Sequence, residues 1–400
     1  MRPLLLLLAA LCALPASAAE IADARPLGLD GANWQFGPLN RWAYTHLREV
    51  LPTKAIPRDP ARIEPIPGLG AVADRIELEL GGETVSLATA MDRHYVDGVL
   101  VLQDGRAVLE RYAGTLTPER PHLLWSVSKT ITGLVAASVA ADGLVDLDRP
   151  VSHYVPALAD SGWGPDPLRA LLDMRDGSAW TEDYAAPDST VRRQDCADGL
   201  LTGPDCAGIP VVGNYRFLPT VPRAPARAGT FAYKSGTTDV VAWVLEAATG
   251  RRFADLVSER LWKPIGAERD ASITVDVSGF TLASGGVSAT LRDVARVGRL
   301  MLDRGRVGDR QVVPAAWIDD LVAQDAGAPW YRSFVWGLGD GRGTFQARGV
   351  HGQFVHVAPA TGTVIALLSS WPDADGGAEG VGEAETIALL AALERAVAEP

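Results

Sequence analysis

Residues 126–143 read SVSKTITGLVAASVAADG, and this stretch predicts a buried helix that begins with a serine and a lysine. Its apolar residues fall around much of the helical wheel, which is typical of a helix inside a core. Gly143 is a typical residue just beyond a helix end. Ser126 and Lys129 are three positions apart, so they lie on one face of the helix with Cβ atoms about 5–6 Å apart. The Lys129 amine can therefore reach the Ser126 hydroxyl.

This pairing has the chemistry of an activated serine. A free serine is a poor nucleophile near neutral pH and needs a neighbouring base. An amine at a helix N-terminus has its charged form disfavoured, so we expect Lys129 to accept a proton. The alternative is a helix start in which Ser126 is the cap and Lys129 a surface charge. Only four of the 37 basic residues are lysines, and the residues after Lys129 are too apolar for an exposed helix, which favours catalysis.

The segments on either side of this helix predict an α+β fold. Strand-like runs occur before the helix and again near the C-terminus, whereas the intervening segment alternates helices with loops. We therefore expect an antiparallel sheet built from both chain ends and flanked by helices, with an inserted, mostly helical domain and the cleft between them. The predicted strand runs are 73–89 and 98–114, each with a central turn, and 332–341, 344–359 and 363–372; helices are predicted at 239–250, 291–305 and 383–398.

The expected domain boundaries follow from this reading. Residues 1–18 have a charged start, a short apolar run and an Ala-Ser-Ala end, which predicts a signal peptide cleaved after Ala18. Residues 19–145 and 311–400 would form the sheet domain, with a Pro-rich N-terminal arm, and residues 146–310 the helical domain. We therefore expect a periplasmic or secreted protein without a stable membrane anchor after cleavage.

The cysteines agree with export. Cys12 would leave with the signal peptide, and Cys196 and Cys206 lie ten positions apart across a loop with Gly and Pro. In an oxidising compartment this spacing predicts a disulfide. A metal site is the alternative, although no histidine or third cysteine lies nearby.

Composition excludes several classes of protein. The chain has 400 residues, 47% of them apolar, which is enough to bury a large core. Its net charge of −12 and the lack of a basic stripe argue against nucleic acid as a partner. The sequence contains no Gly-rich phosphate loop or dinucleotide fingerprint, so we expect no organic cofactor, and we expect no metal. A small-molecule substrate is the expected partner, and the oligomeric state stays open.

Several motifs together resemble the serine hydrolases related to β-lactamases and penicillin-binding proteins, whose Ser-Xaa-Xaa-Lys motif begins a central helix. LLDMRDGSAWTEDY, FAYKSGTTDVVAWVLEAATG and the Gly-rich segment beginning ASGGVSATL are similar to successive segments of that family. The resemblance covers about residues 90–375, and NWQFGPLNRWAYTHLREVLPT, WTEDYAAPDS and ARGVHGQF resemble the 6-aminohexanoate-dimer hydrolase-like branch.

The resemblance implies roles for particular residues. Ser126 would be the nucleophile, Lys129 its proton partner and Tyr233 a second acid/base. Tyr184 would line the cleft and hydrogen-bond the leaving group. The amides of Ser126 and Val350 would form the oxyanion hole.

Departures from the family pattern indicate a different substrate from a β-lactam. Ala347-Arg348-Gly349 stands where penicillin-recognising enzymes have Lys-Thr-Gly, and strand alternation places Arg348 on the opposite face from Ala347 and Gly349. Ser235 replaces an asparagine whose amide helps to hold β-lactams. We therefore expect hydrolysis of an open-chain amide or ester. The alternatives are a carboxylesterase with little amidase activity and a catalytically inactive cell-wall or ligand-binding module.

The remaining candidates have competing interpretations. Tyr233 and Tyr184 could simply pack, and Lys234 should be structural or solvated. His351 is a possible cleft residue, whereas His356, five positions later on the same predicted strand, should be structural and on the opposite face. Glu182 and Asp183 are predicted to form a solvated loop.

Overall fold

Alternating apolar residues from both ends of the chain meet in a central sheet. The computed structural model describes residues 24–68, 76–322, 331–376 and 381–398, and within these the sheet has seven antiparallel strands in the order β11-β12-β13-β14-β15-β4-β5. Its members are β4 (Val96–Gln103), β5 (Arg106–Tyr112), β11 (Tyr331–Arg332), β12 (Val335–Gly337), β13 (Phe345–Gly349), β14 (Gln353–Ala358) and β15 (Thr363–Ser369). In the middle, β15 pairs with β4, Ile365 opposite Val101, which confirms the predicted fold class.

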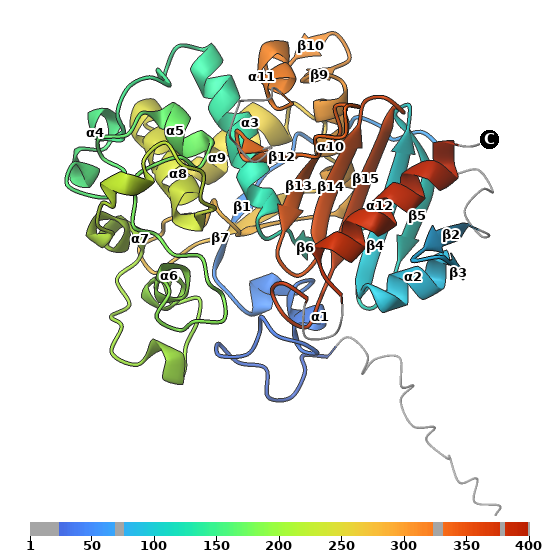
Figure 1. Ribbon diagram of the computed structural model, residues 1–400, viewed down its shortest axis with the longest axis horizontal. Helices are drawn as coiled ribbons and strands as arrows, with labels where there is room; N and C mark the ends of the chain where they lie inside the picture. The colour runs from blue at the N-terminus through green and yellow to red at the C-terminus, as the bar shows by residue number, and fades with distance from the viewer. Residues whose placement is uncertain (1–23, 69–75, 323–330, 377–380, 399–400) are drawn as a thin grey trace, which may run out of the picture.

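Both faces of this sheet are covered, because successive side chains of a strand point in opposite directions. Val99 and Val101 of β4 pack with Leu389 and Leu390 of α12 (Glu383–Ala398), which crosses one face of the sheet (Figure 1). Leu100 lies in the core cluster of the other face, which includes residues of α3 (Val127–Ala141) and α10 (Leu291–Leu302). The predicted helices at 126–143, 291–305 and 383–398 are confirmed.

Short helices surround α3 on the side away from α12 (Figure 1). Its long neighbour is α8 (Ser235–Thr249), which ends at the left-handed Gly250 and confirms the helix predicted at 239–250. The other helices are α1 (Asn40–Ala43), α2 (Leu87–Arg93), α4 (Val151–Tyr154), α5 (Leu168–Leu172), α6 (Thr190–Asp198), α7 (Asn214–Phe217), α9 (Phe253–Val257) and α11 (Ala315–Asp320). Short 3₁₀ turns lie at Leu47–Glu49, Pro156–Leu158, Pro204–Cys206, Leu218–Thr220 and Pro225–Arg227, and a π turn at Ser258–Trp262.

A second sheet, of four strands, contains the strand that directly precedes α3 in the chain. Its order is β1-β7-β8-β6. Strand β6 ends at Leu123, three residues before Ser126. The strands are β1 (Thr53–Ile56), β6 (His122–Leu123), β7 (Ala271–Thr274) and β8 (Val287–Ala289); separate two-stranded sheets join β2 (Glu77–Leu80) to β3 (Glu83–Ser86) and β9 (Arg306–Val307) to β10 (Arg310–Gln311).

Two predicted C-terminal strands are hairpins, and the expectation of a single strand at each place was wrong. Residues 344–359 divide into β13 and β14 around a turn in which His351 has a φ of 59° and Gly352 of 85°. Residues 332–341 divide where Ser333 and Phe334 have φ of 47° and 66°. His351, Ser333 and Phe334 are residue types that seldom adopt these angles, so they did not indicate a turn, and Gly352 was the missed turn signal.

Two predictions about domain organisation remain predictions. The signal peptide at 1–18 lies outside the described residues. The division at 145/146 and 310/311 is untested, although α10, on the helical side of the second boundary, packs against the central sheet in one core cluster that includes Val297 and Val355. None of the described helices is long and apolar enough to cross a membrane.

Candidate active site

The start of α3 brings a serine hydroxyl and a lysine amine into direct contact. Lys129 Nζ donates to Ser126 Oγ at 2.7 Å and to the Ser284 carbonyl oxygen at 2.7 Å. The Ser126 residue is 7% exposed and Lys129 only 1%. The predicted contact therefore forms in a buried environment, where an amine loses the hydration that favours its charged form.

Burial changes the acidity of this lysine. It lowers the Lys129 pKa to about 8, against the opposing influence of the carboxylates of Glu182 and Asp239. Burial also raises the pKa of Asp239, to about 6. Asp239 accepts hydrogen bonds from the Ser284 backbone N–H at 2.9 Å and from the Ser284 hydroxyl at 3.1 Å. Ser284 therefore links the acid to the amine, with its N–H on Asp239 and its carbonyl on Lys129.

Tyr233 belongs to the segment before α8, and its ring lies beside the Lys129 amine. The Lys129 Nζ lies 5.1 Å from the centroid of its ring, and the ring stacks on Trp336 with centroids 5.7 Å apart. Burial raises the Tyr233 pKa, while interaction with the Ser126 side chain lowers it. The phenol is therefore protonated at neutral pH and close to the serine and the lysine.

Ser126 and Val350 line the same cavity. Ser126 stands at the N-terminus of α3 and Val350 in the turn between β13 and β14, and both line the cavity. Within the described part of the chain, neither amide N–H donates to another protein group. A Cβ on Gly349 would lie 2.8 Å from the Leu124 carbonyl oxygen and 3.0 Å from the Ser126 nitrogen, so only glycine allows this approach. The turn that carries Val350 is therefore held directly against the start of α3.

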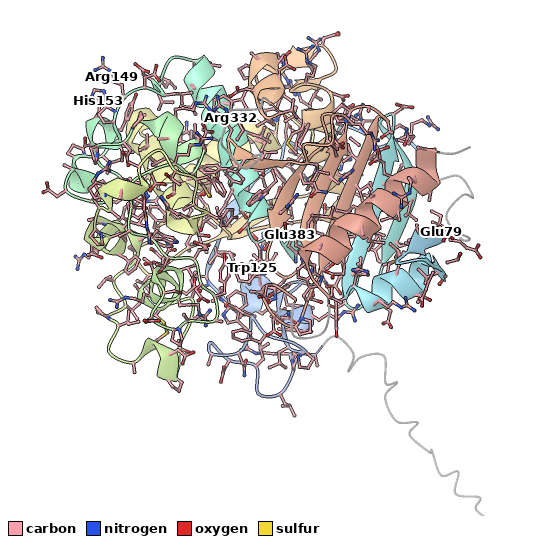
Figure 2. The ribbon with its side chains drawn as sticks, viewed as in Figure 1. Glu79, Trp125, Arg149, His153, Arg332 and Glu383 are labelled. Carbon is pink, nitrogen blue, oxygen red and sulfur yellow. A yellow bond between two sulfur atoms is a disulfide. The ribbon has the colours of Figure 1, made fainter. Side chains whose placement is uncertain are left out.

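These groups open into a cavity of about 450 Å³. Trp125, labelled in Figure 2 near the centre of the molecule, forms part of its wall beside the serine. Of the predicted site residues, Ser126, Lys129, Tyr184, Ser235, Val350 and His351 line this cavity, whereas Tyr233 lines an adjoining one together with Glu182.

The two C-terminal histidines occupy different environments. His351 stacks on Trp125, with ring centroids 5.5 Å apart, and its Nδ1 lies 2.8 Å from the Trp371 carbonyl oxygen. Burial lowers its pKa to about 4, so it is neutral at physiological pH. His356 belongs to β14 and bonds Gln346 at 2.9 Å and Glu394 at 3.2 Å. His351 therefore belongs to the cleft, and His356 is structural.

Glu182 is not the solvated residue that we expected. Its carboxylate accepts hydrogen bonds from Trp180 Nε1 at 2.5 Å, from Tyr184 Oη at 2.6 Å and from the Ser235 backbone N–H at 2.8 Å, as well as from the Ser235 hydroxyl. Asp183 is exposed, as predicted. The missed signal was the i, i+2 spacing of Trp180, Glu182 and Tyr184, which can place three side chains on one side of an extended segment.

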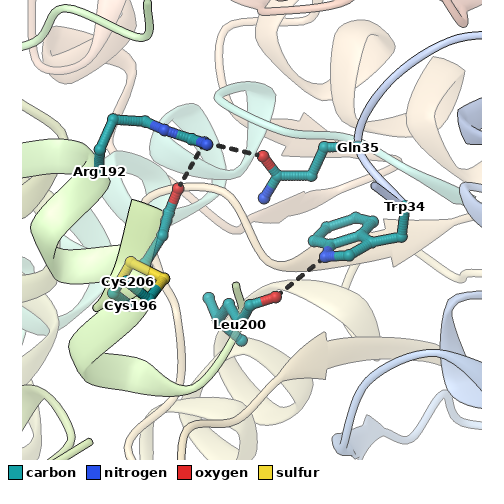
Figure 3. Close-up of a disulfide and its surroundings, with 7 residues drawn as sticks. Trp34, Gln35, Arg192, Cys196, Leu200 and Cys206 are labelled. Atoms are coloured by element: carbon teal, nitrogen blue, oxygen red, sulfur yellow. Dashed lines mark hydrogen bonds and ion pairs between the residues drawn. A yellow bond between two sulfur atoms is a disulfide. The ribbon is translucent and has the colours of Figure 1, made fainter. Parts of the chain in front are cut away.

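Helix α6 and the N-terminal arm supply further residues that the sequence did not reveal. Arg192 bonds Gln35 of the arm at 3.2 Å and Asp195 at 3.4 Å, beside the disulfide (Figure 3). Burial raises the Asp195 pKa to about 7. The cavity wall includes all three side chains and Gln194. No local pattern pointed to them, because Gln35 of the arm and Arg192 of α6 are 157 residues apart and meet only in the fold.

The disulfide and the placement of Lys234 and Arg348 agree with the sequence predictions. Cys196 and Cys206 are bonded, with Cα atoms 5.3 Å apart. Lys234 is fully buried and pairs with Asp176 at 3.0 Å, so its role is structural. Arg348 bonds Glu383 of α12, while Ala347 faces the opposite core.

Comparison with known proteins agrees with this geometry. The beta-lactamase family model matches residues 87–389. A 6-aminohexanoate-dimer hydrolase from Paenarthrobacter ureafaciens is 39% identical over 358 residues, covering 86% of this chain and 88% of the relative. The solved structure of a Bacillus anthracis protein assigned as a 6-aminohexanoate-dimer hydrolase has a TM-score of 0.83 at 25% identity, over 93% of this chain and 96% of that one.

A more distant structure shares the fold alone. EstCE1, described as a hydrolase with promiscuous acyltransferase activity, has a TM-score of 0.58 at 17% identity, over 77% of this chain and 96% of that one. With its long match to the family model and its 39% identity to a curated relative, the chain belongs to the beta-lactamase family of serine hydrolases.

Proposed function

We propose that this protein hydrolyses an open-chain amide or ester bond through an acyl-enzyme formed on Ser126. The observation that carries the proposal is the 2.7 Å contact between Ser126 Oγ and the buried amine of Lys129. The name of the relative, a 6-aminohexanoate-dimer hydrolase, makes a linear amide between aminoalkanoic acids the first substrate to test.

The proposed reaction has two acyl-transfer steps. Ser126 Oγ attacks the carbonyl carbon while neutral Lys129 accepts the hydroxyl proton, and the amides of Ser126 and Val350 hold the oxyanion. Tyr233 donates its proton to the leaving nitrogen or oxygen as the bond to the carbonyl carbon breaks. Tyr233 recovers a proton from Lys129. Water then attacks the acyl-enzyme by the same route and releases the acid and free Ser126.

The β13 edge supports an open-chain substrate over a β-lactam. Ala347-Arg348-Gly349 offers no lysine or threonine to bind a β-lactam carboxylate. Arg348 pairs with Glu383 and its guanidinium lies 5.2 Å from the centroid of the Trp336 ring. Its charge is therefore already engaged at the α12 side of the sheet.

The first experiment measures hydrolysis of short-chain p-nitrophenyl esters and of the linear 6-aminohexanoate dimer by the chain from Ala19 onward. Ser126→Ala should abolish both activities without changing the fold. Lys129→Ala and Tyr233→Phe should each lower turnover at least about 100-fold, as lost proton transfer does. Full activity in Ser126→Ala would overturn the proposal.

A fluorophosphonate probe distinguishes the alternative functions. An enzyme with an activated serine should be labelled at Ser126, whereas an inactive binding module of the same fold should stay unlabelled. Turnover of esters without turnover of the dimer would instead identify a carboxylesterase.

The remaining proposals concern organisation and location. We propose that residues 1–18 direct export to the periplasm or outside the cell, which the disulfide supports because such bonds persist in oxidising compartments. We also propose that residues 19–145 with 311–400, and residues 146–310, act as the two walls of the cleft.

A further inference from the structure

We propose that Glu182 makes the cleft selective for amides over esters, because it takes the hydroxyl protons of Tyr184 and Ser235 and leaves both oxygens as hydrogen-bond acceptors toward the substrate. This inference rests on the proposed hydrolase function. It assigns a positioning role to a carboxylate that the reaction itself does not use.

Four hydrogen bonds are donated to the carboxylate of Glu182. Oε2 accepts from Trp180 Nε1 at 2.5 Å and from the Ser235 backbone N–H at 2.8 Å. Oε1 accepts from Tyr184 Oη at 2.6 Å and from the Ser235 hydroxyl. An ionised carboxylate has about four lone-pair sites, and four donors occupy them. Glu182 therefore has no capacity left to bind the substrate or to exchange protons with it.

Each hydroxyl, of Tyr184 and of Ser235, has only one proton. The direction of that proton decides whether the hydroxyl presents a donor or an acceptor to the cavity. A hydroxyl donates one hydrogen bond and accepts up to two. Since the protons of Tyr184 and Ser235 point at Glu182, only lone pairs remain for the cavity that both residues line with Ser126. Burial, followed by the charge of Glu182, raises the Tyr184 pKa, so this phenol keeps its proton at neutral pH.

Amides and esters meet such a surface differently. A secondary amide carries an N–H, which an acceptor oxygen can bind. An ester has an oxygen in place of the N–H. This oxygen has no proton to donate, and its lone pairs face the lone pairs of the acceptor oxygens. A site built for a substrate N–H discriminates strongly against an analogue that lacks it, because the buried polar groups then stay unpaired.

Packing around Trp180 holds the carboxylate in this position. The Trp180 side chain is 2% exposed, and Arg227 donates to the Trp180 carbonyl oxygen at 2.7 Å. A Cβ on Gly236 would lie 2.4 Å from the Trp180 ring, so the indole lies directly against the first turn of α8. The two N–H donors on Oε2 therefore keep a fixed direction.

Only N–H groups donate to Oε2, whereas only hydroxyls donate to Oε1. This difference makes Glu182→Gln a direct test of the proposal. The two donors at Oε2 cannot accept a hydrogen bond, so the Gln carbonyl oxygen must take that place. Its NH₂ group then faces the Tyr184 and Ser235 oxygens, which must accept from it and turn their own protons toward the cavity. The substitution keeps the shape of the side chain and reverses the polarity of the cleft.

The experiment compares a p-nitroanilide and a p-nitrophenyl ester of 6-aminohexanoic acid, which share an acyl group. In Glu182→Gln we expect the ratio of amide to ester kcat/KM to fall at least about tenfold, the size of an effect from one buried hydrogen bond. Ser235→Ala, which removes one acceptor, should lower the same ratio. Asp188→Asn removes a charge from an exposed position of the same loop and should leave the ratio unchanged.

The outcomes separate this inference from the proposed function. An equal loss of both activities in Glu182→Gln, or an unchanged ratio in both Glu182→Gln and Ser235→Ala, would overturn the selectivity role. If the unsubstituted chain hydrolysed neither substrate, or if Ser126→Ala hydrolysed both at full rate, the failure would lie with the proposed function itself.

Discussion

The amine of Lys129 sits between two opposing influences. Burial favours its neutral form, and the charges of Asp239 and Glu182 favour its protonated form. The resulting pKa of about 8 leaves a usable neutral fraction at neutral pH. Asp239 reaches Lys129 through both backbone groups of Ser284. A buried acid that does not line the cavity therefore influences the acidity of the Lys129 amine.

The pH profile of hydrolysis tests this balance. kcat/KM for an ester should rise with pH and level off above about pH 8, the Lys129 pKa, because only the neutral amine accepts a proton. Asp239→Asn removes a negative charge that stabilises the ammonium, so the rise should move to lower pH. Measuring kcat/KM from about pH 6 to 10 for both chains checks the sign; a shift to higher pH would contradict it.

At the scale of elements, α3 is seated against the hairpin of β11 and β12. Thr130 Oγ1 donates to the Phe334 carbonyl oxygen at 2.9 Å, and a Cβ on Gly133 would lie 2.6 Å from the Ser333 carbonyl oxygen. The glycine inside this helix thus permits a close approach to the hairpin, which matters because α3 also carries Ser126 at its start.

Gly133→Ala should therefore destabilise the protein although alanine is the better helix former. Helix propensity favours alanine by about 1 kcal/mol, while overpacking against backbone costs about 1–3 kcal/mol. We expect a net loss in the free energy of unfolding, measured with urea. Ser138→Ala, at a half-buried position of the same helix, is the control and should have little effect. Stabilisation by Gly133→Ala would refute the close contact.

Helix α6 is tied to its following loop by the disulfide between Cys196 and Cys206. The double substitution Cys196→Ser and Cys206→Ser should lower the free energy of unfolding by about 2–3 kcal/mol, because the open loop gains entropy in the unfolded chain. KM should rise as well, since Arg192 and Asp195 of α6 line the cavity. Equal unfolding midpoints for the double variant and the oxidised parent chain would contradict the expected stabilisation.

At the scale of the whole molecule, the N-terminal arm joins the helical part to the central sheet at the cleft. Trp34 stacks on Trp125 with ring centroids 5.7 Å apart and donates from Nε1 to the Leu200 carbonyl oxygen at 2.9 Å. Asn40 Nδ2 donates to the Trp371 carbonyl oxygen at 2.7 Å. The arm therefore supports Trp125, the residue directly before Ser126.

Trp34→Ala should affect stability and catalysis together. Truncating a buried tryptophan costs about 3–5 kcal/mol, and it removes the ring that supports Trp125. We expect a lower thermal midpoint and, below that midpoint, a lower kcat for ester hydrolysis. Leu27→Ala is the matched control, because Leu27 belongs to the same arm and is fully exposed. Unchanged kcat in folded Trp34→Ala would show that the arm does not support the site.

The sequence by itself determined most of the elements and the contact between Ser126 and Lys129. Period-two and helical patterns predicted the sheet from both chain ends, the buried helix at 126–143 and the C-terminal helix, because each pattern is set by which side of one element is buried. The spacing of Ser126 and Lys129 predicted their contact, because a helix fixes the distance between positions three apart.

The tertiary structure alone decided what surrounds that pair. The turn at Val350, the approach of Asp239 through Ser284 and the contact of the arm with α6 join segments far apart in the chain, so no local pattern encodes them. Glu182 shows the same limit: an acidic residue in a loop reads as solvated until packing places four donors around it. The physical reason is that burial and hydrogen-bond partners, which set charge and polarity, belong to the assembled core.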